Sequence, residues 1–576
     1  MPISEEEQKF LNYLEKLIGL SIPEVSDLQS YTFGYTVDNN HVDGLSLFSC
    51  GLTIIPEKIT TLPFLKKILV RGNKLKVIPE ELCFISSLDT LDLSENRLVK
   101  LPKAIYSLSS LKELHLETNL LTELPDTISS LSSLTLLDLS ENSLHKIPET
   151  IGALENLKSL DLSHNKINEL PDSISNLKSL KLLYLGSNML NSLPESIGSL
   201  SSLKRLNLRN NQLTKLPNSI GNLSALSSLF LKSNNLTYLP DSLCNLKNLK
   251  YLGIMSNKLP LLPETIGSLK SLENLNVSSN YLTELPKSIN SLEALLKLEI
   301  TNNQLIELPD IGNLRSIISF KLDRNMLKSL PESICNLKTL ESLKIDRNEL
   351  EELPDSIGEL SSLKELDLYD NKLKKLPDSL GNLNALEVLD LSKNHLMVLP
   401  ESIGSLTSLK ELDLSNNKLT HLIPSIGNLP LLKNLILGFN RLETIPNSIG
   451  SLSTLENLDL GKNSINQVPA SIGSLKSLKR LYLYYNSLKE IPSTIGELEN
   501  LKYLYLGNNE LTHIPNSIGK LKSLKYLFLR TNFIINIPES IESLSSLQYL
   551  NIERNNLKKF PASLEKLEAR EVKIFK

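Results

Sequence analysis

Aromatic and arginine side chains gather toward the C-terminal end of this sequence of 576 residues. The segment LKRLYLYYNSL (478–488) holds three of the sixteen tyrosines, and LKYLYLGNNEL (501–511) and LKYLFLRTNFI (524–534) bring further rings. Rigid aromatic rings interspersed with arginine have the composition of protein-binding hot spots. The candidate contact residues are Arg480, Tyr482, Tyr484, Tyr485, Tyr503, Tyr505, Tyr526, Phe528, Arg530 and Tyr549.

Charged side chains form further groups upstream of these rings. An acidic stretch lies within residues 92–161, and a small basic group, Lys204, Arg205 and Arg209, follows it. Two interpretations of the carboxylates further along stay open: a secondary binding band, or a solvated surface without a partner. The members of this acidic band are Glu365, Asp367, Asp370, Asp390, Glu411 and Asp413.

Residues that could perform catalysis are not brought together by any motif. The phosphate-binding pattern GxxxxGK[ST] does not occur in the sequence. The seven histidines are scattered without metal-ligand spacing, and none forms an evident triad with serine and aspartate. We therefore expect no catalytic residue, no cofactor and no metal site, and predict that the chain is not an enzyme.

An internal repeat accounts for most of the chain. The string LxxLxLxxNxL recurs from residues 65–75 to residues 547–557, and its asparagine falls every 23 residues from Asn73 to Asn303. One step of 22 residues leads to Asn325, and the step of 23 then resumes to Asn555. A degenerate first copy at 42–52 has Cys50 in the place of the asparagine. A phase held over this length indicates a repeat architecture of about 23 units.

The second half of each unit reads LPESIGSLSS or LPDSIGNLK. Together with the first half, it resembles the leucine-rich repeats of the 23-residue LxxLPxxIxxLxxLxxLxLxxNx class, over roughly residues 42–570. This class is found in intracellular Ras-associated scaffold proteins, Scribble/Erbin-type polarity proteins, plant Ras-group-related repeat proteins and prokaryotic relatives. The resemblance implies a protein partner, and by analogy a small GTPase or a GTPase-linked phosphatase or kinase.

The expected fold is an α/β solenoid, a leucine-rich-repeat horseshoe or superhelix. The leucines point into each coil, and the LxL segments form one continuous parallel β-sheet on the concave face. The asparagine satisfies backbone groups where the chain leaves the strand. Proline and serine of LPDSIG suit short helical or 3₁₀ turns on the convex face.

In this geometry the candidate rings face the concave surface. Strands in register stack equal repeat positions, so Tyr482, Tyr505 and Phe528 would form one column beside a second column that begins with Arg480. The alternative is that aromatic residues merely suit strands and support one another across them. Strand preference would act on every repeat, however, and elsewhere these positions are mostly polar.

The two ends depart from the repeat. Residues 1–40 are predicted to form a helical cap, or otherwise a partner-binding helix, with Ser4 and Glu7 in capping-box spacing and an apolar face. That face comprises Phe10, Leu14, Leu17 and Ile18. The solenoid is predicted over 41–570, and a C-terminal edge strand or tail over 571–576. We expect no effector domain after it.

Two defects interrupt the pattern inside the array. The segment ELPDIGNL (307–314) lacks one residue near Asp310, and THLIPSIGNL (420–429) has its proline one position late, at Pro424. Both fall on the predicted outer face. They indicate either tolerated drift or a hinge, and the sequence leaves this choice open.

Composition narrows the class of partner and the compartment. The net charge of −4 and the isoelectric point of about 6.1 argue against electrostatic binding to nucleic acid. No apolar run is long enough to span a membrane, and the acidic N-terminus does not resemble a secretory signal. Cys83, Cys244 and Cys335 lie too many repeats apart for disulfides. We therefore expect a cytoplasmic protein with free thiols.

These observations predict a non-enzymatic scaffold or adaptor that binds a protein partner on its concave face, in signal transduction linked to a small GTPase. Two alternatives remain at this stage. One is a regulator that activates a small GTPase through a surface residue, and the other is an effector delivered into another cell.

Overall fold

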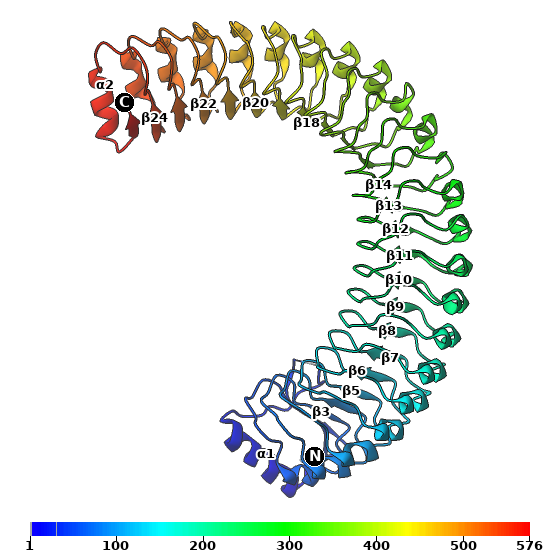
Figure 1. Ribbon diagram of the computed structural model, residues 1–576. Helices are drawn as coiled ribbons and strands as arrows, with labels where there is room; N and C mark the ends of the chain where they lie inside the picture. The colour runs from blue at the N-terminus through cyan, green and yellow to red at the C-terminus, as the bar shows by residue number, and fades with distance from the viewer. Residues whose placement is uncertain (1–2, 30) are drawn as a thin grey trace. The chain divides into compact units, whose positions relative to one another are not determined.

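The computed structural model describes residues 3–29 and 31–576. The chain divides into two compact units, residues 1–282 (unit 1) and residues 283–576 (unit 2). Within each unit, β-strands line the inner side of the curve and short helical turns line the outer side (Figure 1). The expected leucine-rich-repeat solenoid, with a parallel sheet and 3₁₀ turns, is confirmed.

Unit 1 begins with an α-helix and an antiparallel pair of strands, and continues with parallel strands. Its helix is α1 (Glu5–Ile18). Its strands are β1 (Phe33–Asp38), β2 (His41–Leu47), β3 (Lys67–Leu69), β4 (Thr90–Asp92), β5 (Glu113–His115), β6 (Leu136–Asp138), β7 (Ser159–Asp161), β8 (Leu182–Tyr184), β9 (Arg205–Asn207), β10 (Ser228–Phe230), β11 (Tyr251–Gly253) and β12 (Asn274–Asn276). Its 3₁₀ turns are η1 (Glu57–Thr61), η2 (Glu80–Phe84), η3 (Lys103–Ser107), η4 (Asp126–Ser130), η5 (Glu149–Ala153), η6 (Asp172–Asn176), η7 (Glu195–Ser199), η8 (Asn218–Asn222), η9 (Asp241–Asn245) and η10 (Ile266–Ser268).

Unit 2 repeats the same alternation and ends with an α-helix and a last strand. Its strands are β13 (Lys297–Glu299), β14 (Ser319–Lys321), β15 (Ser342–Lys344), β16 (Glu365–Asp367), β17 (Val388–Asp390), β18 (Glu411–Asp413), β19 (Asn434–Ile436), β20 (Asn457–Asp459), β21 (Arg480–Tyr482), β22 (Tyr503–Tyr505), β23 (Tyr526–Phe528), β24 (Tyr549–Asn551) and β25 (Lys573–Phe575). Its helix is α2 (Ala562–Glu568). Its 3₁₀ turns are η11 (Lys287–Ser291), η12 (Glu332–Asn336), η13 (Ile357–Glu359), η14 (Asp378–Asn382), η15 (Glu401–Ser405), η16 (Pro424–Asn428), η17 (Asn447–Ser451), η18 (Ala470–Ser474), η19 (Ser493–Glu497), η20 (Asn516–Lys520) and η21 (Glu539–Ser543).

The core of each coil is made by its leucines and isoleucines, almost all of which are completely buried. In the coil that carries β16, for example, Leu363, Leu366, Leu368 and Leu373 have no exposed surface. Side chains alternate between the two faces of a strand. The residues on either side of each central strand leucine therefore face the concave surface, and these positions determine what that surface can bind.

The asparagine of each repeat joins its coil to the preceding one. Asn257 shows the pattern: Nδ2 donates to the backbone carbonyls of Leu231 and Ile254 at 2.9 Å, and Oδ1 accepts from the backbone N–H of Leu236 at 3.0 Å. The predicted role of these asparagines is confirmed. The residue just before each asparagine adopts a positive φ, for example 57° at Ser256, and the sequence analysis did not anticipate this.

Proline sets the start of most outer turns. Pro400 precedes η15 with φ −71° and ψ 144°, an extended conformation that proline readily adopts. The late proline at 424 becomes the first residue of η16, a position that proline also tolerates. The turn therefore survives the displaced proline.

The repeat that lacks one residue has no 3₁₀ turn between β13 and β14 among the described residues. Its backbone is instead closed locally, because the N–H of Gly312 donates to Oδ1 of Asp310 at 3.0 Å. The strands on both sides stay in register, with Lys297 opposite Ser319 and Ser319 opposite Ser342. This continuity favours tolerated drift over a hinge.

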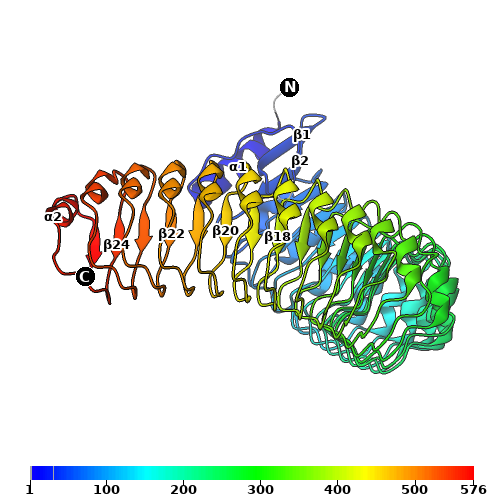
Figure 2. The same cartoon turned by 90° about the horizontal axis from the view of Figure 1, so that it is seen from above.

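The N-terminal helix packs on the first strands of unit 1 (Figure 2). Ser4 and Glu7 form the predicted capping box, and a Glu7 side-chain oxygen also accepts from the backbone N–H of Val42 at 3.3 Å. Phe10 and Leu14 are buried as predicted, but Leu17 is 47% exposed and Leu11 is buried instead. The predicted apolar face was wrong at Leu17. This residue lies in the last turn of α1, where the helix no longer packs on the strands of unit 1.

At the other end, α2 takes the place of the outer turn, and β25 pairs in parallel with β24 (Figure 1). The limits predicted from the sequence (1–40, 41–570 and 571–576) stay a prediction. The four cysteines are free, and Cys83, Cys244 and Cys335 are buried in outer turns. Burial raises the pKa of the Cys83 thiol to about 12 and that of Cys335 to about 11. Within the described ranges no helix has the length and apolarity needed to cross a membrane.

Candidate functional site

The ten candidate contact residues lie on or directly after strands β21 to β24 of unit 2, and we call them the aromatic bay. The strands pair in register, so Tyr482 lies opposite Tyr505, and Tyr505 opposite Phe528. The neighbouring column runs from Arg480 through Tyr503 and Tyr526 to Tyr549. Both predicted columns are present. Whether they bind a partner is a separate matter, taken up below.

The rings of the bay stack on one another along the sheet. Ring centroids are 4.7 Å apart for Tyr482 and Tyr505, and 4.4 Å apart for Tyr505 and Phe528. The second column has Tyr503 and Tyr526 at 5.0 Å with nearly parallel planes. These spacings match the separation of about 4.8 Å between neighbouring strands. Stacking restricts the rotamers of the rings, so little further ordering is needed when a partner binds.

Tyr484 owes its position to a glycine in the preceding repeat. A side-chain carbon added to Gly461 would lie only 2.3 Å from the Tyr484 ring, so this glycine leaves the room that the ring occupies. Tyr484 meets Tyr482 and the exposed Tyr485 edge to face. Burial raises the pKa values of the Tyr482, Tyr484 and Tyr505 phenols, so their hydroxyl groups stay protonated and can donate hydrogen bonds.

The two arginines of the bay are already partnered within unit 2. The Arg480 guanidinium lies 5.4 Å from the centroid of the Tyr503 ring and donates to Oδ1 of Asn457 at 2.9 Å. Nε of Arg530 lies 3.6 Å from Oε2 of Glu553. Both guanidinium groups are exposed and serve as polar edges of an apolar strip.

Three residues extend the bay beyond the set chosen from the sequence. Phe575 stacks on Tyr549 with centroids 4.9 Å apart, and Lys462 lies 4.2 Å from the Phe439 ring centroid and 5.5 Å from that of Tyr485. Phe439, Lys462 and Tyr485 follow one another at the 23-residue spacing, which could have identified them. Phe575 does not follow the 23-residue spacing, so the sequence could not identify it as part of the bay.

The acidic band lies on strands β16 to β18 and the residues that follow them. Asp367, Asp390 and Asp413 form the predicted column of carboxylates. Each accepts a hydrogen bond from the backbone N–H two residues further on, with donors Tyr369 (3.1 Å), Ser392 (2.8 Å) and Ser415 (2.8 Å). These aspartates therefore have a local structural role at the strand ends.

The remaining members of the band are also engaged within unit 2. Glu365 pairs with Lys344 and Asp370 with Lys393, each at 2.7 Å. Glu411 accepts from the side-chain amide of Asn434 at 3.1 Å. These contacts favour a self-satisfied surface over a second binding site.

Replacing Asp367 by asparagine is expected to stabilise the chain at neutral pH. Burial, with the nearby Asp346 and Asp390 carboxylates, raises the pKa of Asp367 to about 6. The Asp367 carboxyl group therefore holds its proton more tightly in the folded chain than in the unfolded chain, and the two states differ in protonation between about pH 4 and pH 6. The charged form costs stability above about pH 6, and this cost vanishes as the pH falls below about 4.

The gain for Asp367→Asn should be about 1 kcal/mol at pH 7.5 after allowance for solvent screening, and near zero at pH 3.5. Urea unfolding at both pH values measures it. The exposed Asp355, changed to asparagine, is the control and should alter stability by less than about 0.5 kcal/mol. A gain that is equal at the two pH values would rule out this electrostatic cause.

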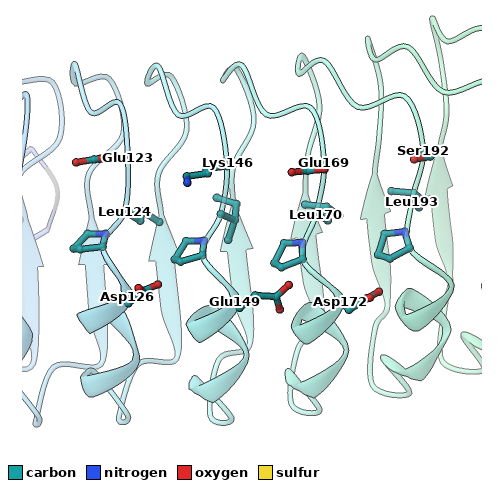
Figure 3. A pocket seen from close by; sticks show the side chains of 15 residues that line it. Glu123, Leu124, Asp126, Lys146, Glu149, Glu169, Leu170, Asp172, Ser192 and Leu193 are labelled. Atoms are coloured by element: carbon teal, nitrogen blue, oxygen red, sulfur yellow. The ribbon is translucent and has the colours of Figure 1, made fainter.

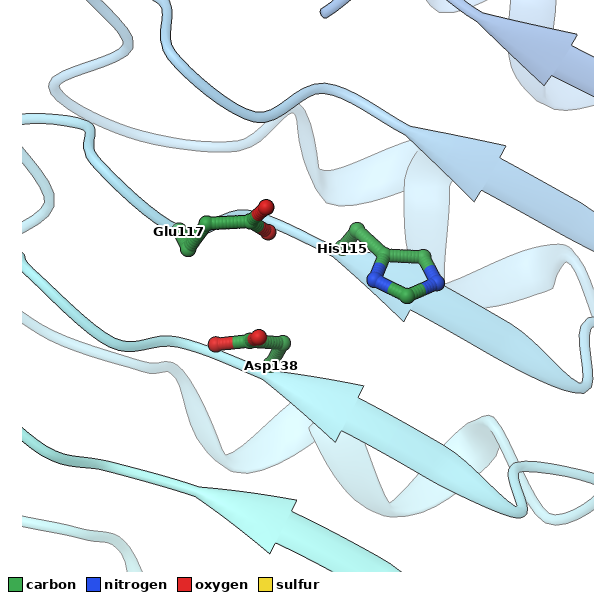
Figure 4. Close-up of side chains that lie close together, drawn as sticks. All are labelled: His115, Glu117 and Asp138. Carbon is green, nitrogen blue, oxygen red and sulfur yellow. The ribbon is translucent and has the colours of Figure 1, made fainter. Parts of the chain in front are cut away.

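In unit 1 the structure brings together His115, Glu117 and Asp138, with one ligand atom of each within 4.8 Å of the others (Figure 4). The group was not predicted from the sequence, although His115 and Asp138 are 23 residues apart and therefore lie opposite each other on neighbouring strands. Both Glu117 oxygens are already engaged, by Nη1 of Arg71 and Oγ of Ser94, each at 2.5 Å. Glu117 is therefore already a partner of Arg71 and Ser94, and Asp138 accepts from the backbone N–H and the hydroxyl group of Ser140.

An open groove on unit 1 follows the Leu–Pro or Ile–Pro steps that lead into four successive outer turns (Figure 3). Its rim carries Glu123, Asp126, Glu149, Glu169 and Asp172, with Lys146 as a basic neighbour. The lining residues recur at the 23-residue spacing, so the groove follows from the regular stacking of these turns.

Comparison with known proteins agrees with this architecture. The family described as "Leucine-rich repeat region" matches residues 127–208, 238–325, 301–394, 412–510 and 447–527. The family "Leucine rich repeat" matches residues 63–121 and 201–259. The chain belongs to the leucine-rich repeat proteins. No curated protein matches it.

Solved structures similar to the chain include plant receptors with bound peptides. The plant peptide hormone receptor RGFR1 in complex with RGF2 is 30% identical, with a TM-score of 0.68 and coverage of 93% of this chain and 92% of the receptor. The Arabidopsis receptor kinase HAESA, in complex with the peptide hormone IDA and the co-receptor SERK1, is 28% identical. Its TM-score is 0.63, with coverage of 96% of this chain and 93% of HAESA.

Proposed function

We propose that the chain is a non-enzymatic scaffold or adaptor that binds a protein partner through the aromatic bay. The observation that carries this proposal is the stacked strip of rings from Tyr482 to Phe575, which crosses five neighbouring strands and stays partly exposed. Clustered, pre-ordered aromatic rings with arginines at their edges provide apolar area and hydrogen-bond donors together.

The similar receptors support a polypeptide as the ligand, since RGFR1 and HAESA are each described in complex with a peptide or peptide hormone. The repeat class suggests a cytoplasmic location and signal transduction linked to a small GTPase, which we propose by analogy alone. Fractionation of the producing cells tests the location. A scaffold should leave the rate of nucleotide hydrolysis by its partner unchanged, whereas an activator of a GTPase should raise it.

A variant carrying Tyr484→Ala, Tyr505→Ala and Phe528→Ala tests the bay directly. Because hot-spot residues each contribute about 2 kcal/mol or more, we expect this variant to bind the partner at least about thirtyfold more weakly than the native chain. The partner is first captured from native lysate and identified by mass spectrometry. Its affinity for both proteins is then measured by titration calorimetry.

Tyr369→Ala is the matched control. Tyr369 is also a half-buried tyrosine on the concave face of unit 2, but it lies against Arg347 and Lys393 rather than in the bay. It should bind the partner as the native chain does. If the triple variant, folded by circular dichroism, retains full affinity, the bay is not the binding surface.

A further inference from the structure

A compact basic site lies on the concave face of unit 1 and includes Arg205 and Arg209 of the basic group noted in the sequence. The guanidinium carbons of Arg205 and Arg209 lie 4.5 Å and 4.4 Å from the ring centroid of Phe230. Tyr251 packs on the same ring with centroids 4.6 Å apart. Phe230 is only 6% exposed although it lies on the concave face, because these side chains cover it.

The local sequence explains how the ring comes to be covered. Phe230 lies between Asn207 on β9 and Gly253 on β11 in register. A side-chain carbon on Gly253 would lie 2.9 Å from the Tyr251 ring, so this glycine leaves the room that Tyr251 occupies. With a shared ring as their platform, the two guanidinium carbons are at most about 9 Å apart.

This site lacks the carboxylate partners that several other concave cations possess. Arg71, Lys321, Lys344 and Lys393 each form an ion pair with a carboxylate. Among the described residues no ion pair is formed by Arg205 or Arg209, or by Lys232, which occupies the repeat position of Arg209 one strand further on. In the part of the chain that the structure describes, Nε of Arg209 is also buried without a hydrogen-bond partner.

Carboxylates are also missing from the surrounding sequence positions. From Tyr184 to Ser256 the concave positions on and directly after strands β8 to β11 contain no aspartate or glutamate. Within unit 1 the nearest carboxylate in the Phe230 column is Asp161, which lies three strands away and already accepts from the backbone N–H of Ser163. The positive charges of Arg205, Arg209 and Lys232 are therefore not balanced by nearby carboxylates, although the chain as a whole is acidic.

We propose that Arg205, Arg209 and Lys232 form a binding site for the phosphate group of a phosphorylated polypeptide. Both guanidinium groups lie close to Phe230, and their N–H groups other than the buried Nε of Arg209 can donate to the oxygens of a phosphate. A phosphomonoester carries close to two negative charges near neutral pH, which suits three cations better than a single carboxylate does. This site lies in unit 1 and does not depend on the aromatic bay.

The first experiment uses phenyl phosphate as the probe and saturation-transfer NMR of the full chain at neutral pH. We expect phenyl phosphate to bind and benzoate to bind at least about tenfold more weakly. The double variant Arg205→Gln, Arg209→Gln should bind phenyl phosphate at least about tenfold more weakly than the native chain. Phe230→Leu, which keeps every charge but removes the platform, should also weaken binding several-fold.

The matched control is Arg480→Gln, since Arg480 is also a concave arginine over an aromatic ring but lies in unit 2. It should bind phenyl phosphate as the native chain does. A second experiment compares a pool of peptides bearing phosphoserine, phosphothreonine or phosphotyrosine with the same peptides unphosphorylated. The native chain, and not the double variant, should retain the phosphorylated pool.

Three results would overturn the proposal. One is equal binding of phenyl phosphate to the native chain and to the double variant. Another is equal affinity for benzoate and phenyl phosphate, which would show a general anion site. The third is binding of inorganic or phenyl phosphate without any preference for phosphorylated peptides.

Discussion

Replacing Phe320 by alanine should lower the free energy of unfolding by about 3–5 kcal/mol, the usual range for truncating a buried aromatic ring. Phe320 is completely buried and heads the largest fully buried side chains of the described residues. It lies on β14 between Leu298 of β13 and Leu343 of β15, where almost all other repeats carry leucine. The alanine variant would leave a cavity that the two rigid neighbouring coils cannot close.

Phe320→Leu is the informative companion to this variant, because it restores the residue typical of the repeat. The segment that leads into β14 is one residue shorter than in the other repeats. We therefore interpret the larger Phe320 ring as filling space in a distorted coil. We expect a loss of about 1 kcal/mol, measured by urea unfolding followed by circular dichroism. A leucine variant as stable as the native chain would show that the ring does not compensate for the shortened turn.

Asn394→Ala should cost about 3 kcal/mol, although its side chain has no apolar surface to lose. The Asn394 amide donates to the carbonyls of Leu368, Leu391 and Ser392 at 2.9, 3.0 and 3.2 Å. Its oxygen accepts from the backbone N–H of Leu373 at 3.0 Å. Alanine would leave these buried backbone groups unpaired, at about 1–3 kcal/mol for each that water cannot reach.

Asn384→Ala serves as the control for that substitution. Asn384 is an exposed asparagine just beyond the outer turn of the same repeat, and its loss should alter stability by less than about 0.5 kcal/mol. Thermal unfolding of both variants by calorimetry compares the two positions. Equal melting temperatures would mean that the buried amide contributes no more than a surface one.

Much of the fold could be predicted because one periodicity determines both the core and the concave surface. The distance between successive asparagines gave the strand register, and register alone placed Tyr482, Tyr505 and Phe528 in one stack. The same reasoning was not applied to His115 and Asp138, which share a repeat position one unit apart. That group was missed although its signal was present.

Other features could not be predicted, because they depend on how particular side chains pack in three dimensions and not on the repeat period. Arg205 and Arg209 lie over Phe230, and Tyr251 packs on the same ring beside Gly253; no periodic pattern predicts these contacts. The antiparallel pairing of β1 and β2 lies outside the repeat and is likewise specific to its own residues. Leu17 was predicted to be buried because the apolar face was extended to the last turn of α1. The strands of unit 1 do not cover that turn.

The asparagine contacts have a consequence for how such a chain can change its length. Each amide bonds to its own coil and to the coil before it, as the bonds of Asn96 to Leu93 and Val70 and of Leu75 to Asn96 illustrate. A gene duplication or deletion of one whole unit would therefore leave every surviving amide with an equivalent set of acceptors and donors. Binding columns on the inner face could be lengthened, shortened or moved apart during evolution with little penalty to the scaffold that carries them.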